Sequence, residues 1–372
     1  MGKKICIITA ARSEYGLLKW VIDEVYHDEE LELQLVVTGA HLSEEHGMTV
    51  RFIEEDDYPI SARVDMHLST DNRTDIIRSM GHCSIGLAET LSSLQPDLVV
   101  VLGDRYELLP IVSACLVASI PVAHLSGGDV TEGAIDNEVR NAVSMMSTLH
   151  FPGVESSAEN LRRMIGREKN IFTVGEPGLE SFLRFDLISS DELSESLGLD
   201  TECRWCLVTL HPETKMSVEE NIAMAQNLFK VMRSTEGVQY VISKANADFG
   251  GAQINQFWEE VVKEDEKRFR LFTSLGQRRY LSFMKQAAGV IGNSSSGIVE
   301  APFLGIPVVN IGDRQKGRHL CKNVIQCGRS FEDMQKAVKA MLKQPIIVDT
   351  YYGDGHTSGI VVRIIKEWLK ER

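Results

Sequence analysis

The sequence lacks the features of a membrane or nucleic-acid-binding protein. No apolar run in its 372 residues is long enough to cross a bilayer, and the first apolar run is interrupted at once by Arg12 and Glu14. Basic residues are also scarce, since 39 Lys and Arg stand against 53 Asp and Glu, for a formal net charge of −14. An acidic total argues against nucleic acid or an anionic membrane as the main partner. A small anion is still a reasonable ligand, provided that arginines are concentrated at one site.

Common cofactor and metal motifs are missing as well. The seven cysteines are an odd number, and the C-x-x-C at Cys203 and Cys206 has no second pair at zinc-site spacing. We therefore expect neither a disulfide framework nor a metal, and a protein of the reducing cytoplasm. No G-x-G-x-x-G follows the first predicted strand, and no Walker A sequence occurs. We expect no cofactor, so that any bound nucleotide belongs to the substrate.

What the sequence does contain is a long alternation of apolar β-type runs with segments of helical periodicity. The runs are rich in Val, Ile and Leu with little alternation, as in parallel strands covered on both faces. A length of 372 residues suits two domains. The composition turns polar and acidic in "LISSDELSESLGLDTE", which we interpret as a connection. The pattern predicts two doubly wound α/β domains facing a cleft, residues 1–178 and 179–355, and a basic amphipathic helix at about 356–372.

Polar residues follow nearly every predicted strand. Because open parallel sheets bind ligands beyond the carboxyl ends of their strands, these residues are the candidate site. They are Arg12, His41, Asp104, Arg105, His124, Ser126, Asp129, His211, Glu213, Lys244, Asn246, Asp248 and the serine run with Asp313 and Arg314.

The segment "GVIGNSSSGIVEAPFLGIPVVNIGDRQKGR" carries the most specific signal. Ser294 and Ser295 offer hydroxyls and backbone N–H groups to a diphosphate where a strand turns into a helix. Glu300 lies one to two turns further on, where a carboxylate can accept both hydroxyls of a ribose, and Arg314 can supply positive charge. The ordinary alternative is a well-capped helix with a solvated acid.

Several acids gather in the first half of the chain. Asp104 ends a strand in "VLGDRYE", and Asp129 and Asp136 follow the next strand. Carboxylates that share one pocket push their pKa values apart, which lets one act as acid and another as base. Asp104 can also be a turn residue, and Asp136 a helix cap. His211 can bind phosphate or shuttle protons, or be a turn histidine.

With these motifs placed, the chain resembles the hydrolysing UDP-N-acetylglucosamine 2-epimerases. The resemblance covers nearly the whole length and rests on "TAARSEYGLL", "TGAHLSEEHG", "VLGDRYE", "HLSGGDVTEGAID", "LHPET", the serine segment and the C-terminal helix. It implies a GT-B-type fold whose final helix packs back on the first domain, a UDP-sugar substrate, and a homodimer or homotetramer. It further implies UDP contacts by Ser294, Ser295, Glu300 and Arg314, a phosphate contact by Arg12, a sugar or nucleotide contact by Asn246, and catalytic roles for Asp104, Asp136 and His211.

The chain departs from the family pattern at one position. Several members have Glu just before the glycine pair of an H-x-E-G-G motif, where this chain has Ser126, and Asp129 follows the glycines instead. We hypothesise that Asp129 supplies the missing carboxylate. The expected substrate is UDP-N-acetylglucosamine, with the UDP-2,4-diacetamido-2,4,6-trideoxyhexose of the legionaminic acid route as the alternative. A GT-B glycosyltransferase, a non-hydrolysing epimerase and a catalytically silent nucleotide-sugar binder are more distant alternatives.

Overall fold

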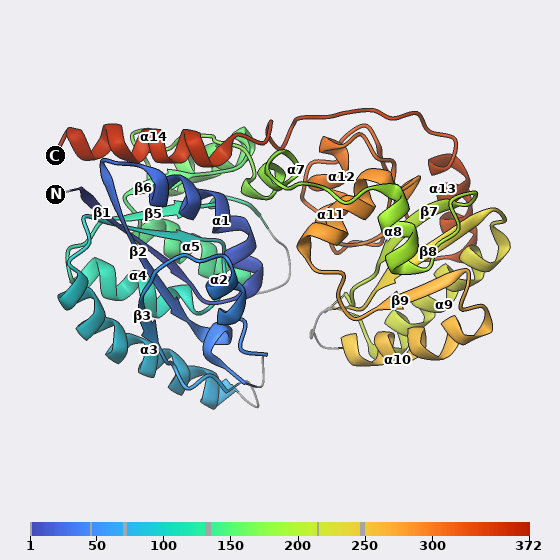
Figure 1. The fold of residues 1–372 in the computed structure, drawn as a ribbon, viewed down its shortest axis with the longest axis horizontal. Helices are drawn as coiled ribbons and strands as arrows, with labels where there is room; N and C mark the ends of the chain where they lie inside the picture. The colour runs from blue at the N-terminus through green and yellow to red at the C-terminus, as the bar shows by residue number, and fades with distance from the viewer. Residues whose placement is uncertain (1, 45–46, 70–72, 131–134, 214–215, 246–249) are drawn as a thin grey trace. The chain divides into compact units, whose positions relative to one another are not determined.

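The computed structural model of the chain describes residues 2–44, 47–69, 73–130, 135–213, 216–245 and 250–372. These residues form two α/β units (Figure 1). Unit 1 consists of the described residues up to Val130, of Ile135–Ser181 and of Gly353–Arg372, and unit 2 of Phe182–Tyr352.

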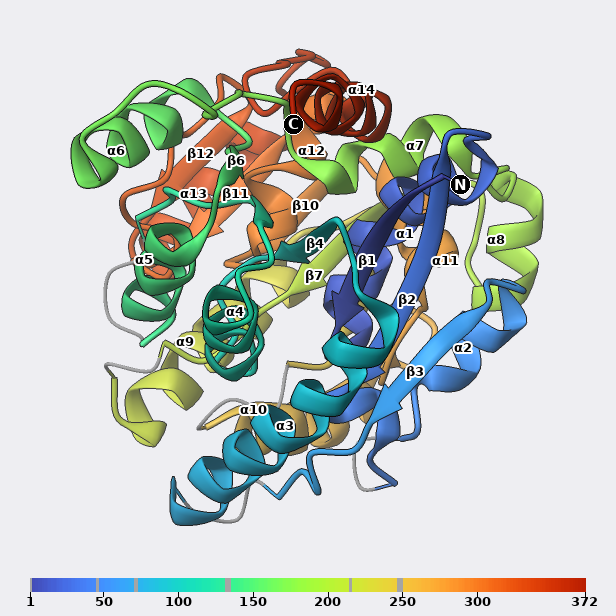
Figure 2. The ribbon, with the colours of Figure 1, turned by 90° about the vertical axis from the view of Figure 1, so that its left-hand side faces the viewer.

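Unit 1 is built on a six-stranded parallel sheet with the strand order β3-β2-β1-β4-β5-β6 (Figure 2). Its strands are β1 (Lys3–Thr9), β2 (Leu31–Thr38), β3 (Ile60–Val64), β4 (Leu98–Leu102), β5 (Val122–Leu125) and β6 (Leu149–Phe151). Its helices are α1 (Arg12–His27), η1 (Gly39–Leu42), α2 (Val50–Glu55), α3 (Arg73–Leu94), α4 (Leu108–Val117), α5 (Asp136–Met146), α6 (Glu155–Ile165), η2 (Pro177–Glu180) and α14 (Thr357–Lys370).

Helices cover both faces of this sheet because successive strand residues point to opposite sides. Ile5 and Ile7 of β1 belong to a buried cluster that includes α1 and α14. Cys6 and Ile8, between and after them, belong to a second cluster formed with α3, α4 and α5. The central strands are therefore apolar on both faces, which explains their continuous Val, Ile and Leu runs.

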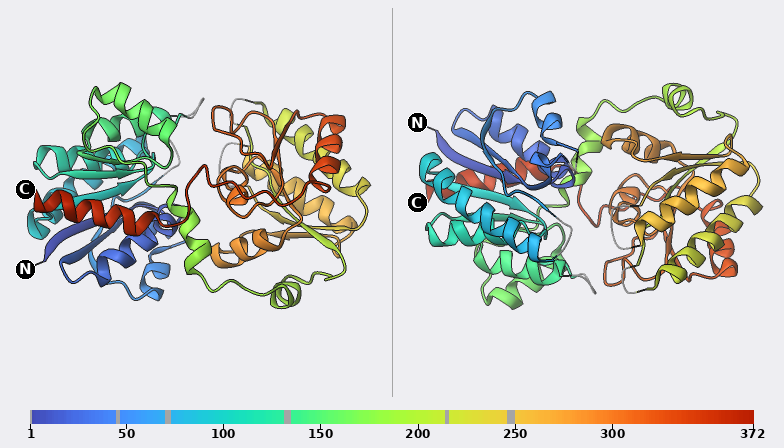
Figure 3. Two further views of the ribbon diagram at one scale, coloured as in Figure 1. Left: turned by 90° about the horizontal axis from the view of Figure 1, so that it is seen from above. Right: turned by 90° about the horizontal axis from the view of Figure 1, so that it is seen from below.

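The C-terminal helix α14 belongs to unit 1, where it packs against α1 and runs along the unit (Figure 3). Val361, Ile365 and Trp368 contribute to the same buried cluster as α1. At its start, the backbone N–H of Ser358 donates to the Glu180 carboxylate at 2.8 Å. The expectation that the final helix packs back on the first domain is confirmed.

Unit 2 repeats the architecture with the strand order β12-β11-β10-β7-β8-β9, again all parallel. Its strands are β7 (Arg204–Thr209), β8 (Val238–Ser243), β9 (Phe269–Phe272), β10 (Gly289–Gly292), β11 (Val308–Ile311) and β12 (Val324–Cys327). Its helices, with α7 at the boundary, are α7 (Ser181–Arg184), α8 (Ser190–Leu197), α9 (Val218–Ser234), α10 (Gly251–Val261), η3 (Val262–Glu264), α11 (Gln277–Gln286), η4 (Ser295–Gly297), α12 (Glu300–Phe303) and α13 (Phe331–Met341).

The fold differs from the sequence expectation in three local respects. The acidic segment interpreted as a connection contains α8, whose N-cap Ser189 accepts from the N–H of Glu192 in a capping box. One of the apolar β-type runs that the sequence predicts to be strands, "NIFTVGEPG", forms only a single bridge, between Ile171 and His150. The edge strands β3 and β12 were not predicted.

Among the described residues, no helix has the length and apolar character needed to cross a membrane.

Candidate active site

Asp104 lies two residues beyond β4 and forms an ion pair with Arg140 of α5. Arg140 is almost fully buried, at 3% exposure, and its second terminal nitrogen donates to the carbonyl oxygen of Asp129 at 2.8 Å. One guanidinium therefore connects the loop after β4 to the loop after β5. A charge so deeply buried needs such partners, because an unpaired one would be costly.

His124 of β5 fixes the loop that carries Asp104. Its Nε2 lies 2.8 Å from the carbonyl oxygen of Gly103, and its Nδ1 lies 3.0 Å from the hydroxyl of Ser144. Since a carbonyl only accepts, Nε2 carries the proton and Nδ1 accepts from Ser144. Burial lowers the pKa of His124 to about 4, so this imidazole is neutral at neutral pH. Its role is to fix the backbone next to Asp104.

Asp129 and Asp136 lie on either side of a short segment outside the described residues. The hydroxyl of Ser157 on α6 donates to the Asp129 carboxylate at 2.5 Å. Asp136 is the first residue of α5, half-buried, with Ile135 at the N-cap position. It lies one helical turn before Arg140, on the same face of α5 as this partner of Asp104.

Arg12 opens α1 directly after β1, and its guanidinium lies 4.6 Å from the centre of the Phe52 ring. The turn before it is held by Glu14, whose carboxylate accepts from the N–H groups of Ala10 at 2.8 Å and Ala11 at 3.2 Å. Burial raises the pKa of Glu14 to about 7. An exposed arginine at the carboxyl end of the central strands is suitably placed to meet an anion.

His41, which follows β2, is a buried structural residue. Its ring nitrogens lie 3.1 Å from the Thr9 hydroxyl and 3.0 Å from the Thr49 hydroxyl. Burial lowers its pKa to about 4. These contacts link the ends of β1 and β2 to the start of α2.

In unit 2, the buried residue Asn293 links three strand ends through its side chain and its backbone carbonyl. Its amide oxygen accepts from the N–H of His211 at 2.7 Å, and its amide nitrogen donates to the His211 carbonyl at 2.9 Å. Its own carbonyl accepts from Arg314 at 3.2 Å and from Gln315 at 2.9 Å. The predicted residues His211 and Arg314 are thereby brought to the serine run. Burial, and then the charge of Arg314, lower the pKa of His211 to about 4.

The serines lie at the single turn η4, which is followed by the four-residue α12, where the sequence indicated one short helix. Ser294 is the N-cap, with its hydroxyl 3.0 Å from that of Ser296, which in turn lies 2.6 Å from the Tyr280 hydroxyl. Ser295 is exposed. Glu300 begins α12 half-buried, and burial raises its pKa.

Gly292 is required by the sheet rather than by a ligand. Its φ is +142°, and a Cβ there would lie 1.9 Å from the carbonyl oxygen of Thr209 in β7. Any side chain would therefore force β10 and β7 apart just below the serine run.

An ion pair between the buried Glu213 and the half-buried Arg329 fixes the loop that carries Arg314. The carboxylate of Glu213 receives Arg329 through two nitrogens, at 2.6 and 3.2 Å, and also accepts from the N–H of Asp313 at 3.0 Å. The same arginine reaches the Asp313 carboxylate at 2.6 Å. Such forked pairs are geometrically specific.

Asn246, predicted to contact the sugar or nucleotide, lies outside the described residues. Within the described ranges, no group of three or more His, Cys, Asp or Glu side chains could hold a metal ion. The C-x-x-C is not a disulfide, since Cys203 and Cys206 are both free, and Cys206 is fully buried in β7.

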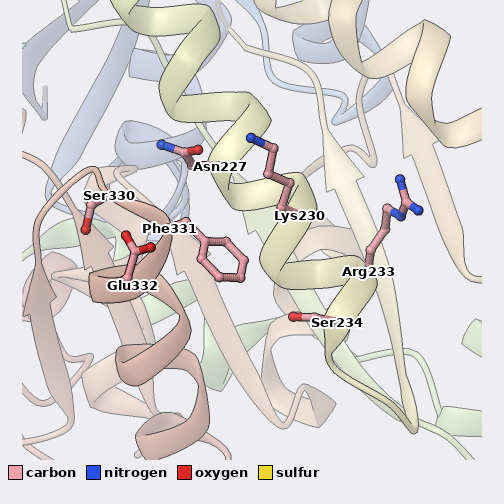
Figure 4. A pocket seen from close by; sticks show the side chains of 7 residues that line it. All are labelled: Asn227, Lys230, Arg233, Ser234, Ser330, Phe331 and Glu332. Carbon is pink, nitrogen blue, oxygen red and sulfur yellow. The ribbon is translucent and has the colours of Figure 1, made fainter.

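A surface hollow of about 810 Å³ between α9 and α13 contains none of the predicted site residues (Figure 4). Lys230 and Arg233 of α9 line it together with Phe331 and Glu332 of α13. These residues lie on helices that cover one face of the unit 2 sheet.

Comparisons with known proteins agree with this arrangement. The UDP-N-acetylglucosamine 2-epimerase family model matches residues 23–366. The chain is 37% identical to GDP/UDP-N,N'-diacetylbacillosamine 2-epimerase (hydrolyzing) of Campylobacter jejuni, over 91% of this chain and 87% of that protein. It is 32% identical to UDP-N,N'-diacetylbacillosamine 2-epimerase (hydrolyzing) of Legionella pneumophila, over 98% of this chain and 96% of that protein.

The fold is likewise that of a solved structure. The Neisseria meningitidis UDP-GlcNAc 2-epimerase bound to UDP-GlcNAc superposes with a TM-score of 0.81 at 17% identity, over 98% of this chain and all of the other. The two Rossmann-like units and their GT-B-like neighbours confirm the predicted fold class. Since the family model spans most of the chain and relatives above 30% identity cover nearly all of it, the chain belongs to the UDP-N-acetylglucosamine 2-epimerase family.

Proposed function

We propose that this chain is a hydrolysing 2-epimerase that acts on UDP-N,N'-diacetylbacillosamine, a 2,4-diacetamido-2,4,6-trideoxy sugar nucleotide. The observation that carries the proposal is the pair of relatives with this activity in their names, at 37% and 32% identity over nearly the full chain. They favour the alternative substrate of the sequence analysis over UDP-N-acetylglucosamine.

The proposed chemistry is an elimination followed by a hydration. The C2 hydrogen of the sugar is a poor acid, because no carbonyl is adjacent to it. Its removal becomes feasible when the C1–O bond to UDP breaks almost at the same time and C1 gains positive charge. A carboxylate takes the C2 proton, UDP leaves with the bonding electrons, and a 2-acetamidoglycal remains. Water then adds at C1 and a proton returns to the opposite face of C2, which gives the free 2-epimer and UDP.

In this proposal Asp104 and Asp136 handle the C2 proton. The buried Arg140 supports the assignment, because its ion pair fixes the Asp104 carboxylate beside α5, the helix that begins with Asp136. Fixed charges of this kind need no reorganisation when charge develops on the substrate. Asp129 is a further candidate acid, and its carboxylate is already hydrogen-bonded to Ser157.

We assign the binding of the leaving diphosphate to Ser294, Ser295, Arg314 and His211, with Arg12 as an additional cation. Asn293 supports this assignment because it binds the backbone of His211 and the guanidinium of Arg314 next to the serine turn. A neutral His211 can donate one hydrogen bond to a phosphate oxygen without adding charge. Glu300 is assigned to the ribose hydroxyls, and Asn246 to the sugar or nucleotide.

The test is to incubate the purified protein in D₂O with UDP-N,N'-diacetylbacillosamine and follow the sugar by NMR. Release of UDP and of the free 2-epimer with one deuterium at C2 is the expected result. Full retention of the substrate hydrogen at C2 would exclude elimination. Return of an epimerised UDP-sugar would indicate a non-hydrolysing enzyme, and UDP binding without turnover a nucleotide-sugar binder.

UDP-N-acetylglucosamine is the second candidate substrate, since the family model that spans residues 23–366 bears its name. The two sugars differ at C4 and C6, where one carries an acetamido and a methyl group and the other hydroxyls. Comparison of kcat/KM for both decides between them. We expect kcat/KM to be at least about tenfold higher for the diacetamido sugar, because the loss of one or two contacts to the sugar's substituents costs about that factor.

A further inference from the structure

The carboxylate of Glu176 lies beside Ser126 at the carboxyl end of the unit 1 sheet. Ser126 directly follows β5 and has a φ of +57°, in the left-handed region that residues other than glycine seldom adopt. Its hydroxyl donates to the carboxylate of Glu176 at 3.4 Å. Both side chains are half-buried, so the pair is partly accessible.

The position of Glu176 is fixed by the sheet. The segment before it runs beside β6, where the N–H groups of Val174 and Gly175 donate to the carbonyls of Pro152 at 3.0 Å and Gly153 at 3.1 Å. Its carboxylate lies directly over Gly153, because a Cβ on that glycine would come within 1.9 Å of the carboxylate oxygen. Pro177 follows at once and opens η2.

This carboxylate is one strand away from Asp104. Leu125 of β5 is in register with Leu102 of β4, and the N–H of Gly103 donates to the carbonyl of Leu125 at 3.1 Å. Ser126 therefore lies beside the loop that carries Asp104, and Glu176 extends over Ser126 at the same edge of the sheet.

Asp129, the residue first expected to replace the missing acid, is held differently. Its carboxylate accepts from Ser157 on α6, and the preceding Gly128 is clamped to the same helix by a 3.0 Å hydrogen bond from Asn160. A Cβ on Gly128 would lie 2.2 Å from the Ser157 carbonyl oxygen. The loop is thus fastened to α6, whereas Glu176 faces Ser126 itself.

We propose that Glu176 provides, across Ser126, the sugar-facing carboxylate that several family members carry at position 126. The inference rests on the proposed function, since it assigns Glu176 to the sugar of the UDP-sugar substrate. A negative charge here stabilises the positive charge that develops at C1 as UDP departs. Ser126 orients this carboxylate through its hydroxyl, and the proton transfers remain with Asp104 and Asp136.

The test compares Glu176→Gln, which keeps the shape and removes the charge, with Glu159→Gln, which removes an exposed charge from α6 of the same unit. We expect Glu176→Gln to lower kcat by about 100-fold, with UDP affinity and melting temperature near those of the wild type. We expect Glu159→Gln to match the wild type. A kcat for Glu176→Gln within about threefold of the wild type, or a parallel loss of UDP affinity, overturns the inference.

A double variant tests whether side chains at positions 126 and 176 can place a carboxylate at the same point. Ser126→Glu placed in the Glu176→Gln background should recover at least about tenfold in kcat over Glu176→Gln alone, because it returns a carboxylate to the same place. A folded double variant with no recovery would contradict the equivalence. Absence of any turnover in the wild type would refute the proposed function and the assignment with it, whereas an active wild type with an equally active Glu176→Gln variant would refute the assignment alone.

Discussion

At the scale of single residues, two neighbouring histidines are in opposite situations. His124 and His150 are partners in the register of β5 and β6, and both are fully or almost fully buried. His124 makes two hydrogen bonds, whereas neither ring nitrogen of His150 has a hydrogen-bond partner among the described residues. An unsatisfied buried polar group destabilises the fold, and a satisfied one does not.

We predict that His150→Leu raises the free energy of unfolding by about 1–3 kcal/mol, because it replaces two unsatisfied nitrogens with apolar volume. Urea denaturation followed by circular dichroism measures the change. His124→Leu is the matched control and should lower the stability by a similar amount, since it leaves the Gly103 carbonyl without its donor. Equal effects of the two substitutions would contradict the prediction.

A second residue-scale prediction concerns Arg140. It reaches Asp104 and the Asp129 carbonyl through different terminal nitrogens, which a lysine cannot reproduce because its ammonium has a single nitrogen. We expect Arg140→Lys to lower kcat by roughly tenfold or more through misplacement of Asp104, with UDP affinity unchanged.

Steady-state kinetics and UDP titration measure the two quantities separately. Arg163→Lys, on the exposed side of α6, is the control and should leave both unchanged. An unaltered kcat in a folded Arg140→Lys variant would show that the ion pair does not position Asp104.

Sequence reasoning found the acids at the strand ends but not the residues that hold them. Arg140 was overlooked because buried arginines are rare, although its spacing of four from Asp136 places both on one helical face. Asn293 stood in the quoted serine segment, but nothing in the chain order indicates that it bonds to His211, 82 residues away. Glu176 was missed for the same reason, because its partner Ser126 is 50 residues away.

At the scale of elements, the long helices and the buried strands follow directly from hydrophobic periodicity. The missed strands β3 and β12 are edge strands of five and four residues that are only partly buried, so their apolar signal is weak. Helix α8 was missed because its exposed face is acidic and rich in serine. Its capping box, Ser189 with Glu192, was readable from the sequence.

The element-scale prediction concerns α14, which returns to unit 1 from the far end of the chain. Trp368 belongs to the same buried cluster as α1 and β1, at 9% exposure. We predict that Trp368→Ala lowers the free energy of unfolding of unit 1 by about 3–5 kcal/mol, since it opens a cavity in that cluster. Denaturation monitored by circular dichroism measures this. Glu367→Ala, on the exposed face of α14, should change little, and a comparable loss there would contradict the role given to Trp368.

At the scale of the whole molecule, the chain length and the alternation of strand-like with helical segments were enough to predict two doubly wound units, because each series of strands and helices forms its own core. The distribution of buried ionisable groups between the units could not be predicted, since it depends on tertiary contacts. Unit 1 holds His41, His124 and His150, whose pKa values burial lowers to about 4, 4 and 3, whereas unit 2 holds His211, with a pKa lowered to about 4.

These shifts make stability depend on pH. An unfolded histidine binds a proton below a pKa of about 6.5, so between about pH 6.5 and 4 each of these groups is protonated in the unfolded chain but not in the folded one. The free energy of unfolding therefore falls as the pH is lowered, by at most about 1.4 kcal/mol per pH unit for each histidine. Glu14 acts in the opposite direction, because its raised pKa of about 7 lets the folded chain bind a proton that the unfolded chain lacks above about pH 4.5.

We therefore predict that the protein loses stability between pH 7 and pH 5, and that unit 1, with three such histidines against one such glutamate, loses more than unit 2. Urea denaturation at the two pH values, with hydrogen exchange to separate the units, measures both effects. His150→Leu should make the pH dependence shallower, since it removes one group that is protonated only on unfolding, and Glu14→Gln should make it steeper, since it removes the opposing one. A stability that is equal at the two pH values, or the same slope in all three proteins, would show that these buried groups do not control the acid response.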